Sequence, residues 1–171
     1  MLDKLEFYHG AALVRLMEHP QCRSVRKCGL GYVVNDEVYV LVKYTTKHRS
    51  PWRFSFDHDD LSGLKSDAQT WKTAVVALVC GGDGVCALTM GQCDRLLGGG
   101  MGWISAKRGF NESYAVAGSA DELEHKVPVM FWPLLVFESI RTGTQSTIPV
   151  CPKPTEASFA TAAMPSRSSM S

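Results

Sequence analysis

The sequence lacks the cysteine and histidine spacings that structural metal sites require. It contains six cysteines but no C-x-x-C pair, and its five histidines are scattered along the chain. Zinc sites in small domains draw their ligands from closely spaced pairs of this kind. We therefore expect no structural zinc site, and we expect the cysteines to be free thiols.

The sequence also lacks a long apolar run. Its longest apolar stretch, residues 127–137, is interrupted by Pro128 and Pro133, and it is far shorter than the roughly 20 residues that cross a bilayer. The first residues contain no basic segment followed by an apolar run, which a secretory signal would need. We expect no membrane partner, no secretory signal and a cytoplasmic location.

No phosphate-binding loop of the type G-x-x-x-x-G-K-[ST] is present. The glycine-rich stretch at residues 81–84 joins two apolar segments, and glycine permits the backbone angles of a tight hairpin. This stretch therefore predicts a turn between two strands, and a phosphate site is not expected there.

What is present is the composition of an ordinary globular domain. The 171 residues are 45% hydrophobic and 20% charged, with a formal net charge of +1. A chain of this length forms one domain with a substantial core. From residue 139 onward Ser, Thr, Pro and Ala dominate, which is typical of disorder. We expect a single globular domain over residues 1–138 and a disordered tail over 139–171.

Charge is distributed unevenly along the chain. Between Gln21 and Arg53, seven Lys and Arg residues stand against two acidic residues. Such an excess favours an anion-binding surface, although a solvated basic surface needs no ligand. The candidate nucleic-acid-binding residues are Arg23, Arg26, Lys27, Lys47, Arg49 and Arg53.

In the first half of the chain, hydrophobic periodicity predicts a helix over residues 2–19 and a first strand near 32–34. Alternating apolar residues over 38–44 and 52–56 predict two strands, which we expect to pair as an antiparallel hairpin. Asp57 is placed to cap a helix that ends near residue 70.

In the second half, the continuous apolar run 74–80 predicts a strand at the centre of the sheet, parallel to an earlier strand. A hairpin partner follows at 85–88. Thr89 with Gln92 and Ser119 with Glu122 each fit a capping box, so each predicts a short helix, the second one closed by Pro128. A further hairpin is expected from 103–107 and 114–117, and the aromatic residues of 129–137 should pack on the domain.

This order of elements resembles the core of the restriction-endonuclease-like superfamily, the PD-(D/E)xK nucleases, and especially archaeal Holliday-junction resolvases. The matching segments are Val40-Leu41-Val42-Lys43, 52–56, 57–70 and 74–80. The resemblance implies a mixed α/β fold, with a three-layer core in which helices flank a central mixed sheet. Segments 50–54 and 79–84 also resemble stretches of uncharacterised bacterial proteins, and that likeness implies no function.

The resemblance carries over to the nuclease site only in part. Lys43 matches the family's lysine, and Glu6 matches a glutamate that many members place on the opening helix. Leu41, however, occupies the place of the acid that binds the metal, and an apolar side chain offers a metal no lone pair. Asp57 could approach from a neighbouring strand, although it also has a sufficient role as a helix cap.

Three functions remain open on these residues. The first is a non-catalytic nuclease-like domain that binds DNA, RNA or a protein partner. The second is an active nuclease with a rearranged Mg²⁺ site built from Lys43, Glu6 and Asp57. The third is a regulatory subunit that contacts a protein partner through Phe131 and Trp132. For Lys43 itself, the simplest interpretation is a strand lysine whose stem lies on apolar neighbours while its ammonium stays in water.

Overall fold

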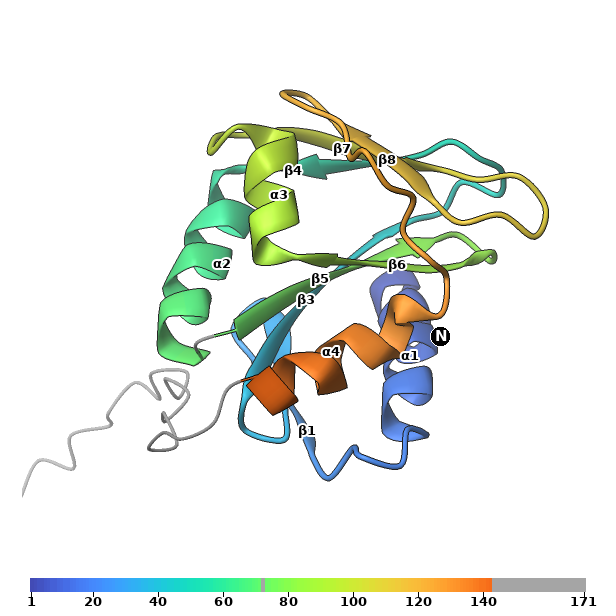
Figure 1. Cartoon of the computed structure of the whole chain (residues 1–171). Coiled ribbons are helices and arrows are strands. Elements are labelled where there is room, and N and C mark those ends of the chain that lie inside the picture. The colour runs from blue at the N-terminus through green and yellow to red at the C-terminus, as the bar shows by residue number, and fades with distance from the viewer. Residues whose placement is uncertain (72, 143–171) are drawn as a thin grey trace, which may run out of the picture.

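The computed structural model describes residues 1–71 and 73–142 of the chain (Figure 1). The predicted opening helix, the helix after Asp57 and the strand at 74–80 are all confirmed. The elements are α1 (Lys4–Met17), β1 (Val25–Cys28), β2 (Gly31–Val34), β3 (Val38–Thr45), β4 (Trp52–Phe56), α2 (His58–Trp71), β5 (Thr73–Cys80), β6 (Gly84–Thr89), α3 (Met90–Leu97), β7 (Gly102–Lys107), β8 (Ala115–Gly118) and α4 (Phe131–Thr142).

Five strands form one mixed sheet in the order β1-β2-β3-β5-β6. Strands β1, β2 and β3 form an antiparallel meander, β5 runs parallel to β3, and β6 returns antiparallel to β5. Parallel neighbours need a crossover connection, and α2 lies within it. The protein is therefore mixed α/β with helices flanking a mixed sheet, as predicted. Strand β5 is interior, although β3 is the middle strand of the five.

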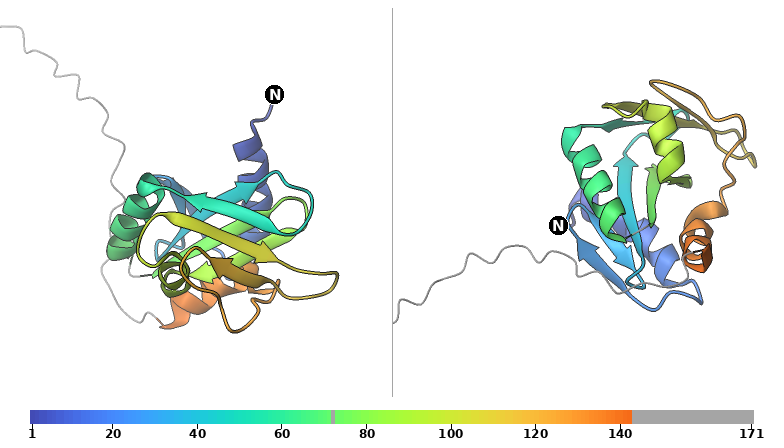
Figure 2. Two further views of the ribbon diagram at one scale, coloured as in Figure 1. Left: turned by 90° about the horizontal axis from the view of Figure 1, so that it is seen from above. Right: turned by 60° about the vertical axis from the view of Figure 1, so that its left-hand side comes forward.

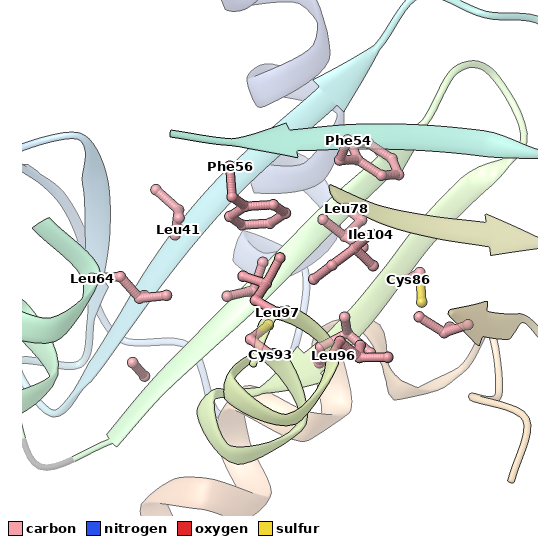
Figure 3. Close-up of a cluster of buried hydrophobic side chains, with 14 of the residues drawn as sticks. Leu41, Phe54, Phe56, Leu64, Leu78, Cys86, Cys93, Leu96, Leu97 and Ile104 are labelled. Atoms are coloured by element: carbon pink, nitrogen blue, oxygen red, sulfur yellow. The ribbon is translucent and has the colours of Figure 1, made fainter. Parts of the chain in front are cut away.

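The two faces of this sheet are covered by different elements (Figures 1 and 2). On one face, α1 and α4 pack through Ala12, Leu16 and Val136 on the valines of β3 and β5. On the other face, α2 and α3 pack with Leu41 and Leu78 in a second core cluster (Figure 3). Because side chains alternate along a strand, successive residues of β3 face different helices.

Strand β4 does not pair with β3, so the predicted hairpin of 38–44 with 52–56 is wrong. Both edges of β3 are occupied, by β2 and by β5. The loop at 46–51 instead carries β4 into a separate three-stranded sheet of order β4-β7-β8. The inner face of this second sheet places Phe54, Phe56 and Ile104 in the core against the main sheet (Figure 3), and its outer face is open to solvent.

The predicted helix at 119–128 is also wrong. This segment runs alongside β8, with isolated bridges between Ala117 and Glu122 and between Tyr114 and Val127. The backbone N–H of Leu123 donates to the carbonyl of Val116 at 2.9 Å. Pairing with the edge of β8 satisfies the backbone groups that a helix would have satisfied internally, and it outweighs the local capping signal. The predicted hairpin of β7 with β8 is confirmed.

One strand and one boundary also differ from expectation. Strand β1 was not predicted, because Arg26 and Lys27 interrupt its apolar pattern. Helix α4 continues to Thr142, so the expected domain end at 138 falls inside it. The rest of the expected tail lies outside the described residues. Within the described part of the chain, no helix is both long and apolar enough to span a membrane.

The cysteines in the described part of the chain are mostly buried. Four are free, Cys22, Cys80, Cys86 and Cys93, which agrees with the prediction for these four. Burial raises the pKa of Cys80 and of Cys93 to about 12, so both remain protonated and poorly reactive. Cys28 is disulfide-bonded, which corrects the expectation that every cysteine is free. Cys151 lies outside the described residues.

Candidate nucleic-acid interface

Lys43 lies near the end of β3 on the face covered by α2. Its Nζ is 2.6 Å from Asp60 Oδ2 and 5.3 Å from the centre of the Phe56 ring, and its side chain is 23% exposed. Asp57 caps α2 as predicted, since its carboxylate accepts a hydrogen bond from the Asp60 N–H. This bond, together with the charge of Lys43, lowers the pKa of Asp57. Lys43 therefore ties the first turn of α2 to β3, and its ammonium is ion-paired as well as partly hydrated.

The structure does not bring Glu6 to Lys43 and Asp57. Glu6 lies in the first turn of α1, which packs on the opposite face of the sheet, and its carboxylate accepts a hydrogen bond from the Asp3 N–H. Leu41, at the position of the family's acid, is 2% exposed and points into the core beside α2. Among the residues described, no group of three or more His, Cys, Asp or Glu side chains could hold a metal ion.

The six predicted nucleic-acid-binding residues fall into two separate groups. The first, which we call the β1 edge, comprises Arg23, Arg26 and Lys27. Arg26 is bound to Asp36, with Nε 2.8 Å from Oδ1, and its guanidinium lies 5.2 Å from the Trp71 ring. These contacts hold Arg26 against the protein.

The other two residues of the β1 edge differ in how tightly they are held. The Nζ of Lys27 lies 4.6 Å from the centre of the Tyr32 ring and donates to the carbonyl of Leu30. Arg23 is exposed, and its backbone N–H donates to Asn35 Oδ1, whereas its guanidinium forms no salt bridge with a described residue. The β1 edge is thus mostly committed to contacts within the domain.

The second group follows β3 and begins in the 46–51 loop. Trp52 Nε1 donates to the carbonyl of Lys47 at 3.0 Å, and Lys47 Nζ donates to the carbonyl of Pro51 at 2.8 Å. Gly81 packs so closely that a Cβ there would collide with the Lys47 carbonyl oxygen. The backbone N–H of Arg108 donates to Ser50 Oγ at 3.2 Å. This loop is therefore held in place against both the β5–β6 turn and the β7–β8 loop.

Behind the loop, Arg108 and Asp83 form a bidentate pair with distances of 2.6 and 3.0 Å. Tyr114 adds a hydrogen bond from its hydroxyl to Asp83 at 2.9 Å. Burial acts to raise the pKa of Asp83, but the hydrogen bonds from Arg108 and Tyr114 outweigh it, and the pKa lies below its ordinary value. Asp83 is thus a fixed carboxylate that joins the loops at this end of the domain.

The outer face of the second sheet continues from this loop. Strand β4 points Arg53 and Ser55 outward, and β7 points Trp103, Ser105 and Lys107 to the same side, opposite the buried Ile104. The Arg53 guanidinium lies 4.3 Å from the centre of the Trp103 ring. Lys107 is exposed.

We define the basic platform as this outer face with its adjoining loop, represented by Lys47, Arg49, Arg53, Trp103 and Lys107. Three of these five residues were predicted from the charge excess. Trp103 and Lys107 were missed because they lie outside the basic segment of the sequence. In the sequence, Ile104 and Ala106 alternate with Ser105 and Lys107, and this alternation was the signal that could have placed Trp103 and Lys107 on the outer face.

The platform is hollowed at Ser105, two residues along β7 from Trp103. Small side chains, among them Ser105, Ala115 and Ala117, leave a shallow open depression of about 320 Å³. Pro51 and Lys107 also line it, and Glu122 is the acidic side chain in its lining. The platform thus combines an aromatic ring, basic side chains and a space that a planar group could enter.

The predicted protein-binding residues Phe131 and Trp132 do not form an exposed patch. Trp132 is 3% exposed, and its Nε1 donates to the carbonyl of Ala12 at 3.2 Å. Phe131 is partly buried and packs against both core clusters. Both aromatics attach the start of α4 to the domain, which agrees with the prediction that the aromatic residues of this segment pack on it.

Comparison with protein-family models, with curated proteins and with solved structures finds no match to this chain.

Proposed function

We propose that this protein binds nucleic acid through the basic platform and does not cleave it. The observation that carries the proposal is that the fold brings Lys107 to the same open sheet face as Arg49 and Arg53, although more than fifty residues separate Lys107 from them in the sequence. Arg49 and Lys107 form no salt bridge with any described residue, so their charges are free to meet phosphates.

The restriction-endonuclease-like resemblance enters as part of this proposal. An opening helix, an antiparallel meander, a crossover helix and a strand parallel to the third strand follow one another as α1, β1-β2-β3, α2 and β5. This order supports descent from such a nuclease core. The lack of cleavage is supported by the burial of Leu41 at the acid's position and by the placement of Glu6 across the sheet from Lys43.

Fluorescence anisotropy with labelled DNA tests binding directly. The platform has four cationic residues, Lys47, Arg49, Arg53 and Lys107. If each contacts a phosphate, the logarithm of the binding constant should fall with the logarithm of the salt concentration with a slope of roughly −3. Arg49→Ala and Lys107→Ala should each weaken binding and reduce this slope, whereas Arg23→Ala, which removes an exposed arginine at the β1 edge, should change neither. Absence of salt-dependent binding, or an equal loss with Arg23→Ala, would refute the proposal.

The absence of cleavage needs its own measurement. Incubation of single-stranded, duplex and branched DNA with the protein and Mg²⁺ or Mn²⁺ should leave all three intact. Metal-dependent cutting that disappears in Lys43→Ala would instead establish the nuclease alternative, in which Lys43 and Asp57 act at the start of α2.

A further inference from the structure

The outward side chains of β7 form a row of unusual composition for a solvent-facing strand. Trp103, Ser105 and Lys107 alternate with the buried Ile104 and Ala106. Four residues of strand, at about 3.4 Å each, place the row's two ends roughly 14 Å apart. An aromatic ring thus stands at one end of the row and an ammonium at the other, with a small side chain between them.

Trp103 and Arg53 together offer a stacking surface. The guanidinium lies over the ring, 4.3 Å from its centre, and both groups are planar, so a base would stack on a face that the other plane leaves uncovered. Unpaired nucleobases stack on aromatic rings and on arginine planes, which is how single strands are held without sequence preference. In a duplex the base faces are already stacked on one another, so only phosphates and groove edges could reach this pair.

The depression at Ser105, two residues from Trp103 on the same strand, extends this surface toward Lys107. Its volume of about 320 Å³ arises because Ser105, Ala115 and Ala117 are all small, and larger side chains would fill it. Its walls are largely apolar, which suits a base more than a phosphate. Lys107, which lines the depression and is exposed, is placed to pair with the phosphate that follows.

We propose that the basic platform selects single-stranded nucleic acid, with one base stacked on Trp103 and Arg53, a second base in the adjacent depression, and the backbone passing along Lys107 and Arg49. This inference rests on the proposed function and deepens it, since it names the form of nucleic acid that is bound. Charge complementarity between the platform and a phosphate backbone identifies the occupant of this open face.

Intrinsic tryptophan fluorescence tests the inference at a single residue. Of the four tryptophans, Trp52, Trp71 and Trp132 are 2–3% exposed, whereas Trp103 is partly exposed. An unlabelled single-stranded DNA of roughly 15 nucleotides, within the usual site size, should quench the emission on binding, because a base would stack on Trp103. A duplex of the same length should bind at least tenfold more weakly and quench little.

Three variants and one control separate stacking from general charge. Trp103→Leu should weaken single-strand binding by roughly 10- to 100-fold, the range for losing one stacked base, and Trp103→Phe should restore most of it. Ala115→Leu, which partly fills the depression from an exposed position, should weaken single-strand binding severalfold. Thermal unfolding of each variant serves as the control for folding.

The outcomes distinguish this inference from the function on which it rests. If single-stranded and duplex DNA bind equally and Trp103→Leu has no effect, the inference is wrong while phosphate binding by the platform stands. If neither form binds at moderate salt, both are wrong. Selective binding of the single strand that depends on an aromatic residue at position 103 supports both.

Discussion

The β1 edge and the basic platform carry similar numbers of positive residues, but these residues differ in how many partners they have within the protein. At the β1 edge, Arg26 is bound to Asp36 and packed near Trp71, and Lys27 lies over Tyr32. On the platform, Arg49 and Lys107 form no salt bridge with a described residue. A count of charges along the sequence treats the two regions alike, but the topology gives one of them partners and leaves the other open.

The two regions also differ in what surrounds the charges. The aromatic rings at the β1 edge belong to packed side chains, since Trp71 is 2% exposed. Trp103 on the platform lies on a solvent-facing strand surface. A cation beside a buried ring contributes to the fold, whereas a cation beside an accessible ring leaves both groups available to a ligand.

We expect the strongest effect on affinity from a pair of double variants, each of which removes two positive charges from one of the two regions. Arg49→Ala/Lys107→Ala should reduce affinity for single-stranded DNA about 100-fold, at roughly tenfold per charge-assisted contact. The matched double variant Arg23→Ala/Lys27→Ala should change affinity less than about twofold, because Arg23 and Lys27 belong to the β1 edge and not to the platform. Anisotropy titrations at one salt concentration measure both. Equal losses would mean that only net charge matters.

A second prediction concerns the support behind the platform. Arg108→Ala removes the bidentate partner of Asp83. Because both side chains of this pair are mostly buried, at 17% exposed for Arg108 and 26% for Asp83, the change should lower the free energy of unfolding by about 1–2 kcal/mol. Binding should weaken severalfold because the Arg108 side chain ties the β7–β8 loop to the β5–β6 turn on which the 46–51 loop packs, even though the backbone N–H that bonds Ser50 Oγ is retained. Urea unfolding measures the first effect, and Lys126→Ala, which breaks an exposed pair with Glu112, is the control expected to leave stability unchanged.

A third prediction sharpens the role of the β1 edge in the fold. Burial, assisted by the charge of Lys27, lowers the pKa of His9, whose Nδ1 lies 2.9 Å from the Tyr32 hydroxyl. The unfolded chain therefore takes up a proton on His9 at higher pH than the folded chain does. The contribution of His9 to the free energy of unfolding is therefore fully present above its pKa of about 6.5 in the unfolded chain. It is lost as the pH falls toward the lower pKa that His9 has in the folded protein.

Lys27→Met should reduce this loss of stability at low pH by roughly 0.5 kcal/mol, because removing the charge raises the pKa of His9 in the folded state. Thermal unfolding between about pH 7.5 and pH 5 measures the difference, with His9→Gln as the variant that should remove this contribution. Nucleic-acid affinity should not change in Lys27→Met. A loss of affinity there would instead assign the β1 edge to the interface.

The smallest expected effect concerns the acidic residue in the platform. Glu122 lines the depression beside Lys107, so it repels an incoming phosphate backbone. Glu122→Gln should raise affinity about twofold at low salt, and the gain should vanish at high salt because exposed charges are screened. An unchanged affinity at low salt would place the bound strand away from the depression.

The sequence predicted most helices and strands but not how the strands are distributed between two sheets. The alternation in 52–56 correctly indicated one buried and one exposed face. Its partner was misassigned because β3, with both faces covered and both edges paired, has no edge left for β4. Only the long-range pairing of β4 with β7 shows this, and local periodicity carries no information on such pairings.

The candidate interface was predictable to a similar extent. Lys47, Arg49 and Arg53 follow from the local charge excess, whereas Trp103 and Lys107 join them only through the register of β4 with β7. Glu6 and Lys43 were predicted to lie together by family resemblance. They are separated because α1 packs beneath the valines of β3 while Lys43 alternates to the other face.

The most direct test of the platform is its footprint in solution. Backbone amide chemical shifts of the labelled protein, recorded as single-stranded DNA is added, report which residues the ligand contacts. We predict the largest changes in the 46–56 and 102–107 segments, together with the indole N–H of Trp103, and small changes at residues 23–28. Large changes at 23–28 with an unperturbed Trp103 would contradict it.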